Sequence, residues 1–362
     1  ICKSLASIAP AVDFIRVGSE LSCDEAYRGH LIENELSSCN RRSEVYERIR
    51  NCRIIVGTVA AISGKPELFR LKHFDVAIID EATQILEPQL LGILCARGED
   101  GKDAIDKFVL IGDHKQLPAV VQQNTEQSAI YDESLLSIGL TNLKDSLFER
   151  LYRNCTATVH RSYDMLCRQG RMHPEVALFA NRAFYGGRLI PVGLPHQIES
   201  SDTICRLAFY PSVPEKVGAS AKINYSEARI VADLAVRIYE DHQADFDESR
   251  TLGIITPYRS QIALIKKEIE SLGIPALNRI LVDTVERFQG SERDVIIYSF
   301  CVNYPYQLKF LSNLTEEEGV LIDRKLNVAL TRARKQMFIT GVSELLERNP
   351  LYKSLLKLIE SF

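Results

Sequence analysis

The sequence predicts an α/β protein with parallel sheets, built as two tandem domains. Short apolar runs alternate along the chain with stretches of helical periodicity, which is typical of parallel α/β architecture. Two of the runs lead directly into polar residues, Asp80 and Glu81 in one case and Asp113 in the other. A length of 362 residues suits two domains of ordinary size.

In the first domain, four apolar segments are predicted to form strands, and the polar stretches between them hold helices and loops. The predicted strands are Asp13–Gly18, Arg53–Val59, Asp75–Ile79 and Lys107–Gly112, and the predicted helices are Pro88–Leu94 and one that ends at Ser146–Arg150. We place the domain boundary near residue 148, so the first domain covers residues 1–148 and the second covers residues 149–362.

The second domain repeats this alternation. Its clearest helix is Tyr225–Tyr239, which has Ile230, Leu234 and Ile238 on one face, as a helix packed on a sheet requires. The other predicted helices are Met165–Ala183, Arg259–Gly273 and Arg324–Ala333, and the predicted strands are Thr203–Phe209, Thr251–Thr256, Ile280–Asp283, Asp294–Cys301 and Gln336–Gly341.

Composition describes an ordinary globular protein, with 46% apolar and 25% charged residues. No stretch approaches the roughly 18 continuous apolar residues of a membrane span, so no membrane partner is expected. Nine scattered cysteines without a CxxC pair argue against a zinc site. They fit reduced thiols in the cytoplasm, or in the nucleus of a eukaryote. A net charge of −4 argues against a polyanion-binding surface built from bulk charge, but it allows a local groove that binds nucleic acid.

The adjacent acids Asp80 and Glu81 follow the apolar run Val76–Ile79. Ligands of parallel sheets bind beyond the carboxyl ends of strands, where two acids suit a metal ion and an activated water. Acids are also common in the first turn of a helix, so the pair could simply cap the next helix. On this stretch alone the two interpretations are about equal.

The segment Leu110–Val120, LIGDHKQLPAV, repeats the same logic at a second strand end. Gln116 at this point could hydrogen-bond a terminal phosphate or an attacking water. The alternative is a turn stabilised by Asp113 and Pro118. Two polar strand ends close in sequence favour one shared nucleotide site.

Three later motifs contain arginine or glycine at informative positions. They are QGRMHPE with Arg171, DTVERFQGSERD with Gln289 and Gly290, and LNVALTRAR, a predicted helix that presents Arg332 and Arg334 near its C-terminal end. Glycine lets the backbone approach a ligand closely. Arginine at a helix end can merely complement the helix dipole, but an arginine brought to a γ-phosphate strongly stabilises phosphoryl transfer.

In this order, the motifs closely resemble those of superfamily 1 helicases, in the branch that contains nonsense-mediated-decay helicases and replication nuclease-helicases. DEATQ resembles motif II, GDHKQLPAV motif III, and QGRMHPE the arginine motif often written QYRMH. VDTVERFQGSERD resembles motif V, and LNVALTRAR motif VI. The resemblance covers about residues 53 to 341.

The resemblance implies two tandem RecA-like domains of the P-loop NTPase type, which bind ATP and Mg²⁺ in the cleft between them. Asp80 would hold Mg²⁺ through water, and Glu81 would activate the hydrolytic water. Gln116 would sense the γ-phosphate, and Arg171 and Arg332 would neutralise its charge from the second domain.

The resemblance also implies that Gly290, beside Gln289, lies near the phosphates and that Glu292 approaches the ribose. The residues it implies on the nucleic-acid side are Thr58, Pro257, Tyr258 and Thr284. For Tyr258, simple packing at a strand end is about as good an interpretation.

Two departures from the family pattern matter. No Walker A sequence, GxxxxGK followed by Ser or Thr, occurs in the chain. We therefore interpret the chain as a C-terminal portion of a longer helicase, with the first domain truncated at its N-terminus, and expect this portion alone to be inactive as an ATPase. Gly170 stands where the family often has a tyrosine that stacks on adenine, which leaves the base contact open.

Two functions from different classes remain. The first is an ATP-dependent helicase or translocase that moves along a single strand, 5′ to 3′ in this family branch, with DNA preferred to RNA. The second is a nucleic-acid-binding scaffold with a degenerate ATPase half. The complete set of acids and arginines favours the motor, whereas the residues alone do not separate DNA from RNA, because backbone contacts dominate such channels. Protein partners are not predicted.

Overall fold

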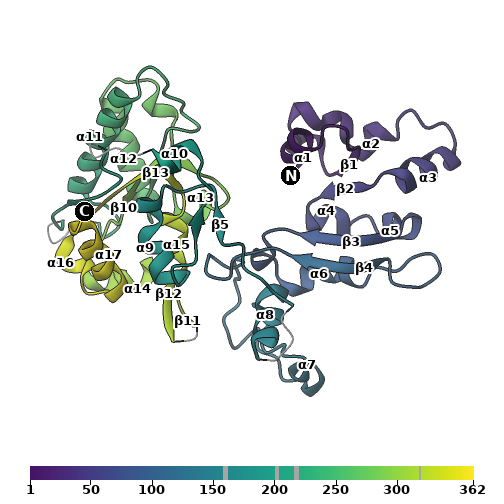
Figure 1. The fold of residues 1–362 in the computed structure, drawn as a ribbon. Helices are drawn as coiled ribbons and strands as arrows, with labels where there is room; N and C mark the ends of the chain where they lie inside the picture. The colour runs from purple at the N-terminus through teal and green to yellow at the C-terminus, as the bar shows by residue number, and fades with distance from the viewer. Residues whose placement is uncertain (158–161, 200–203, 216–219, 318) are drawn as a thin grey trace. The chain divides into compact units, whose positions relative to one another are not determined.

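The chain folds into two compact units (Figure 1). The first unit contains residues 1–114 and 118–163, and the second contains residues 115–117 and 164–362. The computed structural model describes residues 1–157, 162–199, 204–215, 220–317 and 319–362.

The boundary predicted near residue 148 falls inside helix α8 (Leu147–Ala157), which belongs to the first unit. A buried ion pair fixes this helix there, because the Nε of Arg150 donates to Glu87 over 2.8 Å. As a division between functional domains, residue 148 remains a prediction.

The described part of the first unit contains two parallel strand pairs. β1 (Phe14–Val17) pairs with β2 (Ile54–Gly57), and β3 (Phe74–Ile79) pairs with β4 (Ile105–Leu110). Its helices are α1 (Cys2–Ile8), α2 (Ile32–Glu35), α3 (Arg42–Asn51), α4 (Val59–Ser63), α5 (Glu67–Leu71), α6 (Glu87–Leu94), α7 (Glu133–Ser137) and α8.

Among the residues that the structure describes, those that cover the β3–β4 pair lie on one of its faces. Ala77, Ile79, Phe108 and Leu110 alternate toward a core that includes residues of α5, α6 and α8. The opposite face carries Val76, Ile78, Val109 and Ile111, which are 45%, 66%, 44% and 42% exposed. The first unit therefore presents an apolar sheet face, hereafter the open face.

The second unit is built on a five-stranded parallel sheet in the order β7-β13-β10-β8-β9. Each neighbouring pair is parallel, so the predicted α/β class with parallel sheets is confirmed. The strands are β7 (Leu207–Pro211), β8 (Leu252–Ile255), β9 (Leu281–Asp283), β10 (Arg293–Ser299) and β13 (Ala333–Gly341).

Helices cover both faces of this sheet (Figure 1). Val295 and Ile297 of β10 pack with α11 (Tyr225–Asp241) and α12 (Arg259–Ser271). Ile296 and Tyr298 point the other way, into the core that includes α9 (Pro174–Phe184), α15 (Arg324–Leu330) and α17 (Pro350–Glu360). Burial on both faces explains the uninterrupted apolar run of β10.

Smaller elements complete the second unit. They are β5 (Arg168–Gln169), β6 (Ile190–Pro191), α10 (Pro195–Ile198), α13 (Val285–Phe288), α14 (Leu308–Leu311), α16 (Ser343–Leu346), and the antiparallel hairpin β11 (Leu314–Glu317) with β12 (Val320–Asp323).

Two predicted helices have different bounds in the structure. The helix predicted at Met165–Ala183 begins only at Pro174, because proline suits the first helical turn but not a helix interior. The helix predicted at Arg324–Ala333 ends at Leu330, so Arg332 lies in a turn and Arg334 in β13. The start predicted at Thr203 for β7 lies outside the described residues. Within the part of the chain that the structure describes, no helix has the length and apolar character needed to cross a membrane.

Candidate functional site

Asp80 and Glu81 directly follow β3 and are both exposed. Glu81 adopts a left-handed backbone conformation with φ 52° and ψ 36°, which is uncommon for a residue with a side chain and typical of functional sites when it occurs. Its carboxylate makes no cap hydrogen bond to the backbone of the 3₁₀ turn Ala82–Gln84 and instead accepts one from the side-chain amide of Gln84. Glu81 therefore stands at the N-cap position of this turn without a side-chain capping bond, and the choice between cap and metal site stays a prediction.

The strand ends beside these acids are held close together. The Ile111 amide donates to the Ile79 carbonyl, and the Ala82 amide donates to the Ile111 carbonyl, both over 2.8 Å. A Cβ at Gly112 would lie 2.9 Å from Cγ2 of Thr83, so this approach requires glycine. The structure thus brings the ends of β3 and β4 side by side, and the exposed carboxylate oxygens are the kind of ligand that Mg²⁺ prefers.

Thr58 lies in the other strand pair of the first unit, directly after β2. It is exposed and caps α4, because its hydroxyl oxygen accepts the amide hydrogen of Ala61 over 3.2 Å. Its predicted contact with nucleic acid remains a prediction.

The short segment Lys115–Leu117 packs within the second unit. The side-chain amide of Asn327 donates to the Lys115 carbonyl over 2.9 Å, and that of Gln289 donates to the Leu117 carbonyl over 3.3 Å. Leu117 is buried in the core of the second unit. These contacts fix the backbone on both sides of Gln116.

The side chain of Gln116 is contacted by Arg332. Its guanidinium donates to Oε1 of Gln116 over 3.3 Å and to the carbonyls of Val328 and Ser291. Only 2% of Arg332 is exposed. Gln116 and Arg332, two of the three residues predicted to act on the γ-phosphate, therefore contact each other, and the arginine is fixed by backbone carbonyls.

Arg171 and Glu292 form an ion pair in the same unit, with 2.6 Å between Nε and Oε2. Arg171 also donates to the carbonyl of Thr331, the residue before Arg332. Their side chains are 34% and 44% exposed, so both can reach a ligand. The structure thus gathers Gln116, Arg171, Glu292 and Arg332 around the Thr331 turn.

The two glycines of interest differ in their surroundings. Gly290 has φ +81°, a conformation that favours glycine, and it opens onto free space beside Gln289. A Cβ at Gly170 would lie 3.3 Å from Leu194 and 3.4 Å from Val192, so a larger residue here would need these side chains to shift by a few tenths of an ångström. Gly170 therefore lies against the segment that contains Val192 and Leu194.

The predicted nucleic-acid residues of the second unit stand at neighbouring strand ends. Pro257 and Tyr258 follow β8, and Thr284 follows β9, the strand that pairs with β8 through Ile255 and Asp283. Tyr258 is partly exposed, its hydroxyl accepts a hydrogen bond from Gln307, and burial raises its pKa. The structure brings these three residues together.

A buried polar cluster beside these strand ends was not predicted. Glu227 is fully buried, and its carboxylate accepts hydrogen bonds from the hydroxyl of Ser299 over 2.6 Å and the amide of Cys301 over 2.8 Å. Burial raises the pKa of Glu227 to about 7. The available signal was Asn224 three residues earlier, the N-cap of α11, because an Asn-x-x-Glu spacing is typical of a helix start.

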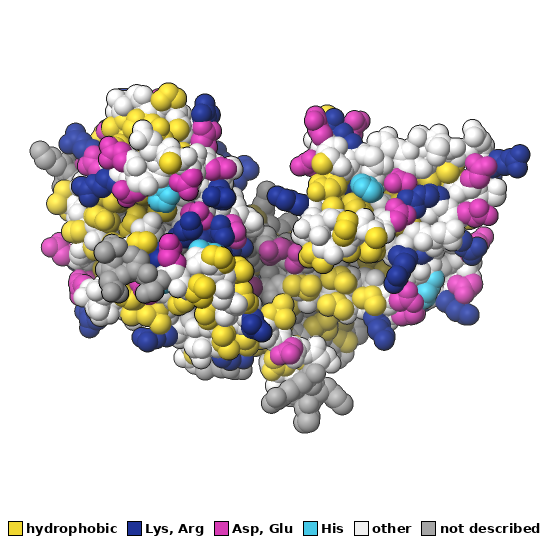
Figure 2. All heavy atoms as spheres, turned by 45° about the horizontal axis from the view of Figure 1, so that its top comes forward, with side chains coloured by type: hydrophobic (Ala, Val, Ile, Leu, Met, Phe, Trp, Pro, Cys, Tyr) yellow, Lys and Arg dark blue, Asp and Glu magenta, His cyan; other side chains and the backbone are white. Residues whose placement is uncertain are grey.

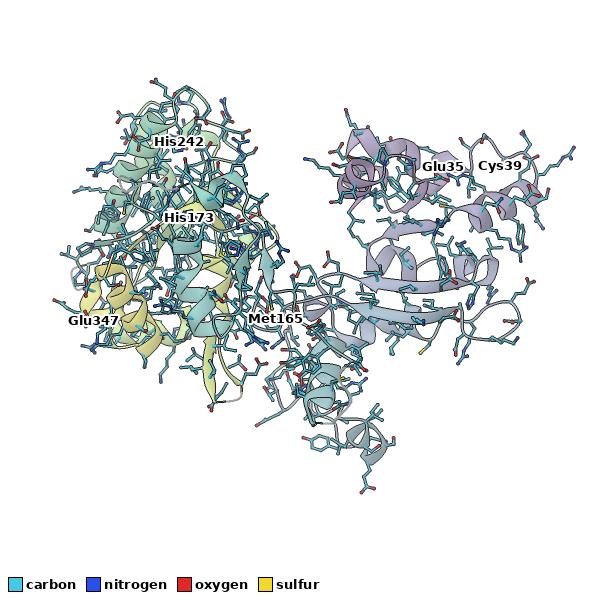
Figure 3. The ribbon with its side chains drawn as sticks, viewed as in Figure 1. Glu35, Cys39, Met165, His173, His242 and Glu347 are labelled. Atoms are coloured by element: carbon cyan, nitrogen blue, oxygen red, sulfur yellow. The ribbon has the colours of Figure 1, made fainter. Side chains whose placement is uncertain are left out.

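Basic and acidic side chains are interspersed on the face drawn in Figure 2. Among the described residues, one group has the spacing of metal ligands, namely Asp13, His30 and Glu35. Arg48 lies 2.7 Å from both carboxylates, so a guanidinium already neutralises this group. Glu35 is labelled in Figure 3, together with His173, which caps the start of α9 in the second unit.

Two family models match the chain. One described as "AAA domain" matches residues 143–344, and another with the same description matches residues 29–124.

Similar curated proteins carry helicase names. The "DNA replication ATP-dependent helicase/nuclease DNA2" of Xenopus laevis is 30% identical over 338 residues, which cover 83% of this chain and 28% of that protein. The "Probable helicase MAGATAMA 3" of Arabidopsis thaliana is 31% identical over 320 residues, and the match covers 84% of this chain and 35% of that protein. The yeast "DNA polymerase alpha-associated DNA helicase A" is 28% identical over 84% of this chain and 44% of its own length.

This chain therefore spans less than half the length of these relatives. Among solved structures, the arterivirus nonstructural protein 10 helicase in complex with DNA matches 96% of this chain and 52% of its own, with 13% identity and a TM-score of 0.44.

Proposed function

This chain belongs to the AAA-domain family of superfamily 1 helicases, with tandem RecA-like domains, and from that premise we propose that it is part of an ATP-dependent motor that moves along single-stranded nucleic acid. We propose DNA as the preferred strand, because two of the similar proteins are named for DNA replication or DNA polymerase. The 5′-to-3′ direction is proposed from the family branch, and a cytoplasmic or nuclear location from the nine free thiols.

We assign the ATPase roles residue by residue. Asp80 would hold Mg²⁺, and Glu81 would take the proton of the attacking water, which suits its exposed carboxylate at the end of β3. Gln116 senses the terminal phosphate, while Arg171 and Arg332 neutralise the charge that develops on it. Bound Mg²⁺ would supply further charge neutralisation on the phosphate oxygens.

We assign nucleotide binding to Gln289, Gly290 and Glu292, and contacts with the nucleic acid to Thr58, Pro257, Tyr258 and Thr284. The single observation that carries the proposal is the meeting of Gln116, Arg171, Glu292 and Arg332 around one turn, although they come from four separate motifs. A scaffold that does not act on a nucleotide would not need these four side chains to lie together.

We further propose that these 362 residues alone do not turn over ATP. The sequence contains no Walker A loop, so the loop amides, the lysine and the Mg²⁺-binding hydroxyl that cradle the β- and γ-phosphates are not supplied by it. The residues present therefore fit Mg²⁺ and the phosphate charge only in part.

The test combines two measurements on the purified chain. Fluorescence anisotropy compares its affinity for single-stranded DNA, single-stranded RNA and duplex DNA, and we expect the single strands to bind more tightly, DNA most of all. Phosphate release from ATP and Mg²⁺ is measured with and without single-stranded DNA, and we expect no release above that of Glu81→Gln.

The possible results separate the proposals. DNA-stimulated phosphate release that Glu81→Gln abolishes would support the motor and overturn the predicted inactivity of the chain. The scaffold would be favoured by a different pair of results. A longer natural protein would bind single strands as tightly as this chain does, and it would also lack ATPase activity. Failure to bind either single strand would overturn the proposed function.

A further inference from the structure

Two tyrosines stand together beside the predicted nucleic-acid residues of the second unit. The rings of Tyr304 and Tyr306 are stacked, with centroids 5.7 Å apart and planes 14° apart. Tyr306 is 55% exposed, and Tyr304 is partly exposed. An exposed, parallel aromatic pair in a connecting segment requires an explanation, because apolar ring faces gain nothing from water.

Buried amide side chains hold this pair in place. Oε1 of Gln307 accepts hydrogen bonds from the backbone amides of Asn303 and Tyr304, both over 2.9 Å. The Asn303 side chain in turn donates to the carbonyl of Ile223 over 2.7 Å. Gln307 and Asn303 are both buried, and Pro305 further restricts the segment. The aromatic pair is therefore presented rigidly, which lowers the entropy cost of binding.

The same glutamine joins the pair to Tyr258. The side-chain amide of Gln307 donates to the Tyr258 hydroxyl over 3.2 Å and to the Ala221 carbonyl over 2.7 Å. One buried side chain thus fixes both Tyr258 and the Tyr304–Tyr306 segment. The aromatic pair continues the strand-end surface to which nucleic-acid contacts are assigned.

Two cations and one acid stand near the pair: Lys309 and Arg259 are exposed, while Glu215 donates its backbone amide to Asn303 and its carboxylate accepts from the Tyr225 amide. Lys309 and Phe310 follow Tyr306 by three and four residues, a spacing that places side chains on one helical face, and both are exposed. Arg259, directly after Tyr258, is exposed as well. Flat aromatic faces with nearby cations are the combination that binds single strands without reading their sequence.

We propose that Tyr304 and Tyr306 form a stacking platform for the unpaired bases of single-stranded nucleic acid. The inference rests on the proposed function, because it extends the path of the same strand beyond Pro257 and Tyr258. The lysine and arginine side chains contact phosphates, while the tyrosine rings contact bases.

The test measures binding of the full chain to a single-stranded DNA oligonucleotide by anisotropy. Tyr306→Ala is expected to raise Kd about tenfold, since one base–aromatic stack contributes about that factor. Tyr306→Phe should bind like the unchanged chain, because the ring face remains. Tyr131→Ala, at a tyrosine of the first unit that is 82% exposed, is the matched control and should bind normally.

An oligonucleotide of abasic sites separates stacking from general contact. It keeps the phosphates and removes the bases, so Tyr306→Ala and the unchanged chain should bind it equally. A 2-aminopurine base in the normal strand should lose fluorescence on binding to the unchanged chain and less on binding to Tyr306→Ala. Unaltered thermal unfolding of the variants shows that the fold is retained.

Each other result overturns the platform. If Tyr304→Ala and Tyr306→Ala bind the normal strand like the unchanged chain, the platform is wrong while the proposed function stands. Equal weakening of normal and abasic strands would show that the rings do not stack on bases. If the unchanged chain binds no single strand at all, both proposals fall together.

Discussion

The β3–β4 pair of the first unit and the five-stranded sheet of the second unit are built from similar apolar runs but are covered differently. In the second unit, Ile296 and Ile297 point to opposite faces and both are fully buried. In the first, Ile79 is buried while its neighbour Ile78 is 66% exposed. A continuous apolar strand predicts burial on both faces, and only the second sheet has it. The second unit thus has a complete core, whereas the first presents an apolar patch of the kind that binds partners or aggregates.

The largest expected effect is a difference in stability lost when an isoleucine is truncated in each of the two sheets. Ile297→Ala should lower the free energy of unfolding by about 2–5 kcal/mol, because it opens a cavity in a core closed on both sides. Ile78→Ala makes the same chemical change on the open face and should cost about 0.5 kcal/mol. Urea denaturation followed by circular dichroism gives both values, and hydrogen exchange assigns each to its unit. Equal losses would mean that the open face is covered in solution.

The acidic residues near the strand ends also differ between the two units, in how deeply their carboxyl groups are buried. Asp80 and Glu81 of the first unit are exposed, whereas Glu227 of the second is fully buried and has its pKa raised to about 7 by burial. The folded state therefore binds this proton more tightly than the unfolded state does, for which the ordinary value is 4.5. The resulting stability is fully present below pH 4.5 and is lost as the pH rises through about 7.

Glu227→Gln should remove this pH dependence. At pH 8 the variant should be more stable than the unchanged chain by up to about 3 kcal/mol, because an amide needs no deprotonation in the buried site. At pH 4.5 the two should be nearly alike. The check is the unfolding midpoint of the second unit from pH 4.5 to 8. Parallel pH profiles for the two proteins would contradict the assignment. Burial also raises the pKa of Asp323, so part of the pH dependence should remain.

The smallest expected effect is the stability lost when an ion pair is removed, and this loss should be larger in the first unit than in the second. Arg48 lies 2.7 Å from both Asp13 and Glu35, whereas Arg171 pairs with Glu292 in a more exposed position. Arg48→Gln should cost about 1 kcal/mol and Arg171→Gln about half of that, since exposed pairs contribute little. Both costs should shrink with added salt. Thermal unfolding at low and high salt provides the measurement, and a larger, salt-independent cost at Arg171 would reverse the ranking.

Local pattern was sufficient to locate most strands and several helices. The strands predicted at Asp75–Ile79 and Lys107–Gly112 agree with β3 and β4 to within two residues, because apolar runs and their flanking turn residues are local signals. The start of α9 was misplaced, since apolar residues before Pro174 suggested a helix that proline does not allow. The end of α15 was misplaced because helical periodicity continued past Leu330 into the residues that begin β13.

The candidate site was predictable in composition but not in arrangement. The motifs supplied Gln116, Arg171, Glu292 and Arg332, and the structure brings these four together. Nothing local indicated that Arg332 would be buried against backbone carbonyls. The cluster around Glu227 was missed altogether, because its partners Ser299 and Cys301 lie more than 70 residues away in sequence.

The sequence by itself determined the α/β class, the order of the motifs and the family, because each depends on residues that are near neighbours along the chain. Only the tertiary structure decided that residues 115–117 pack in the second unit, that Glu227 is buried with a raised pKa, and that one face of β3–β4 is open. The physical reason is that burial and hydrogen-bond partnership depend on which distant segments meet. The free energy of a polar or apolar side chain is therefore set by neighbours that its own segment does not specify.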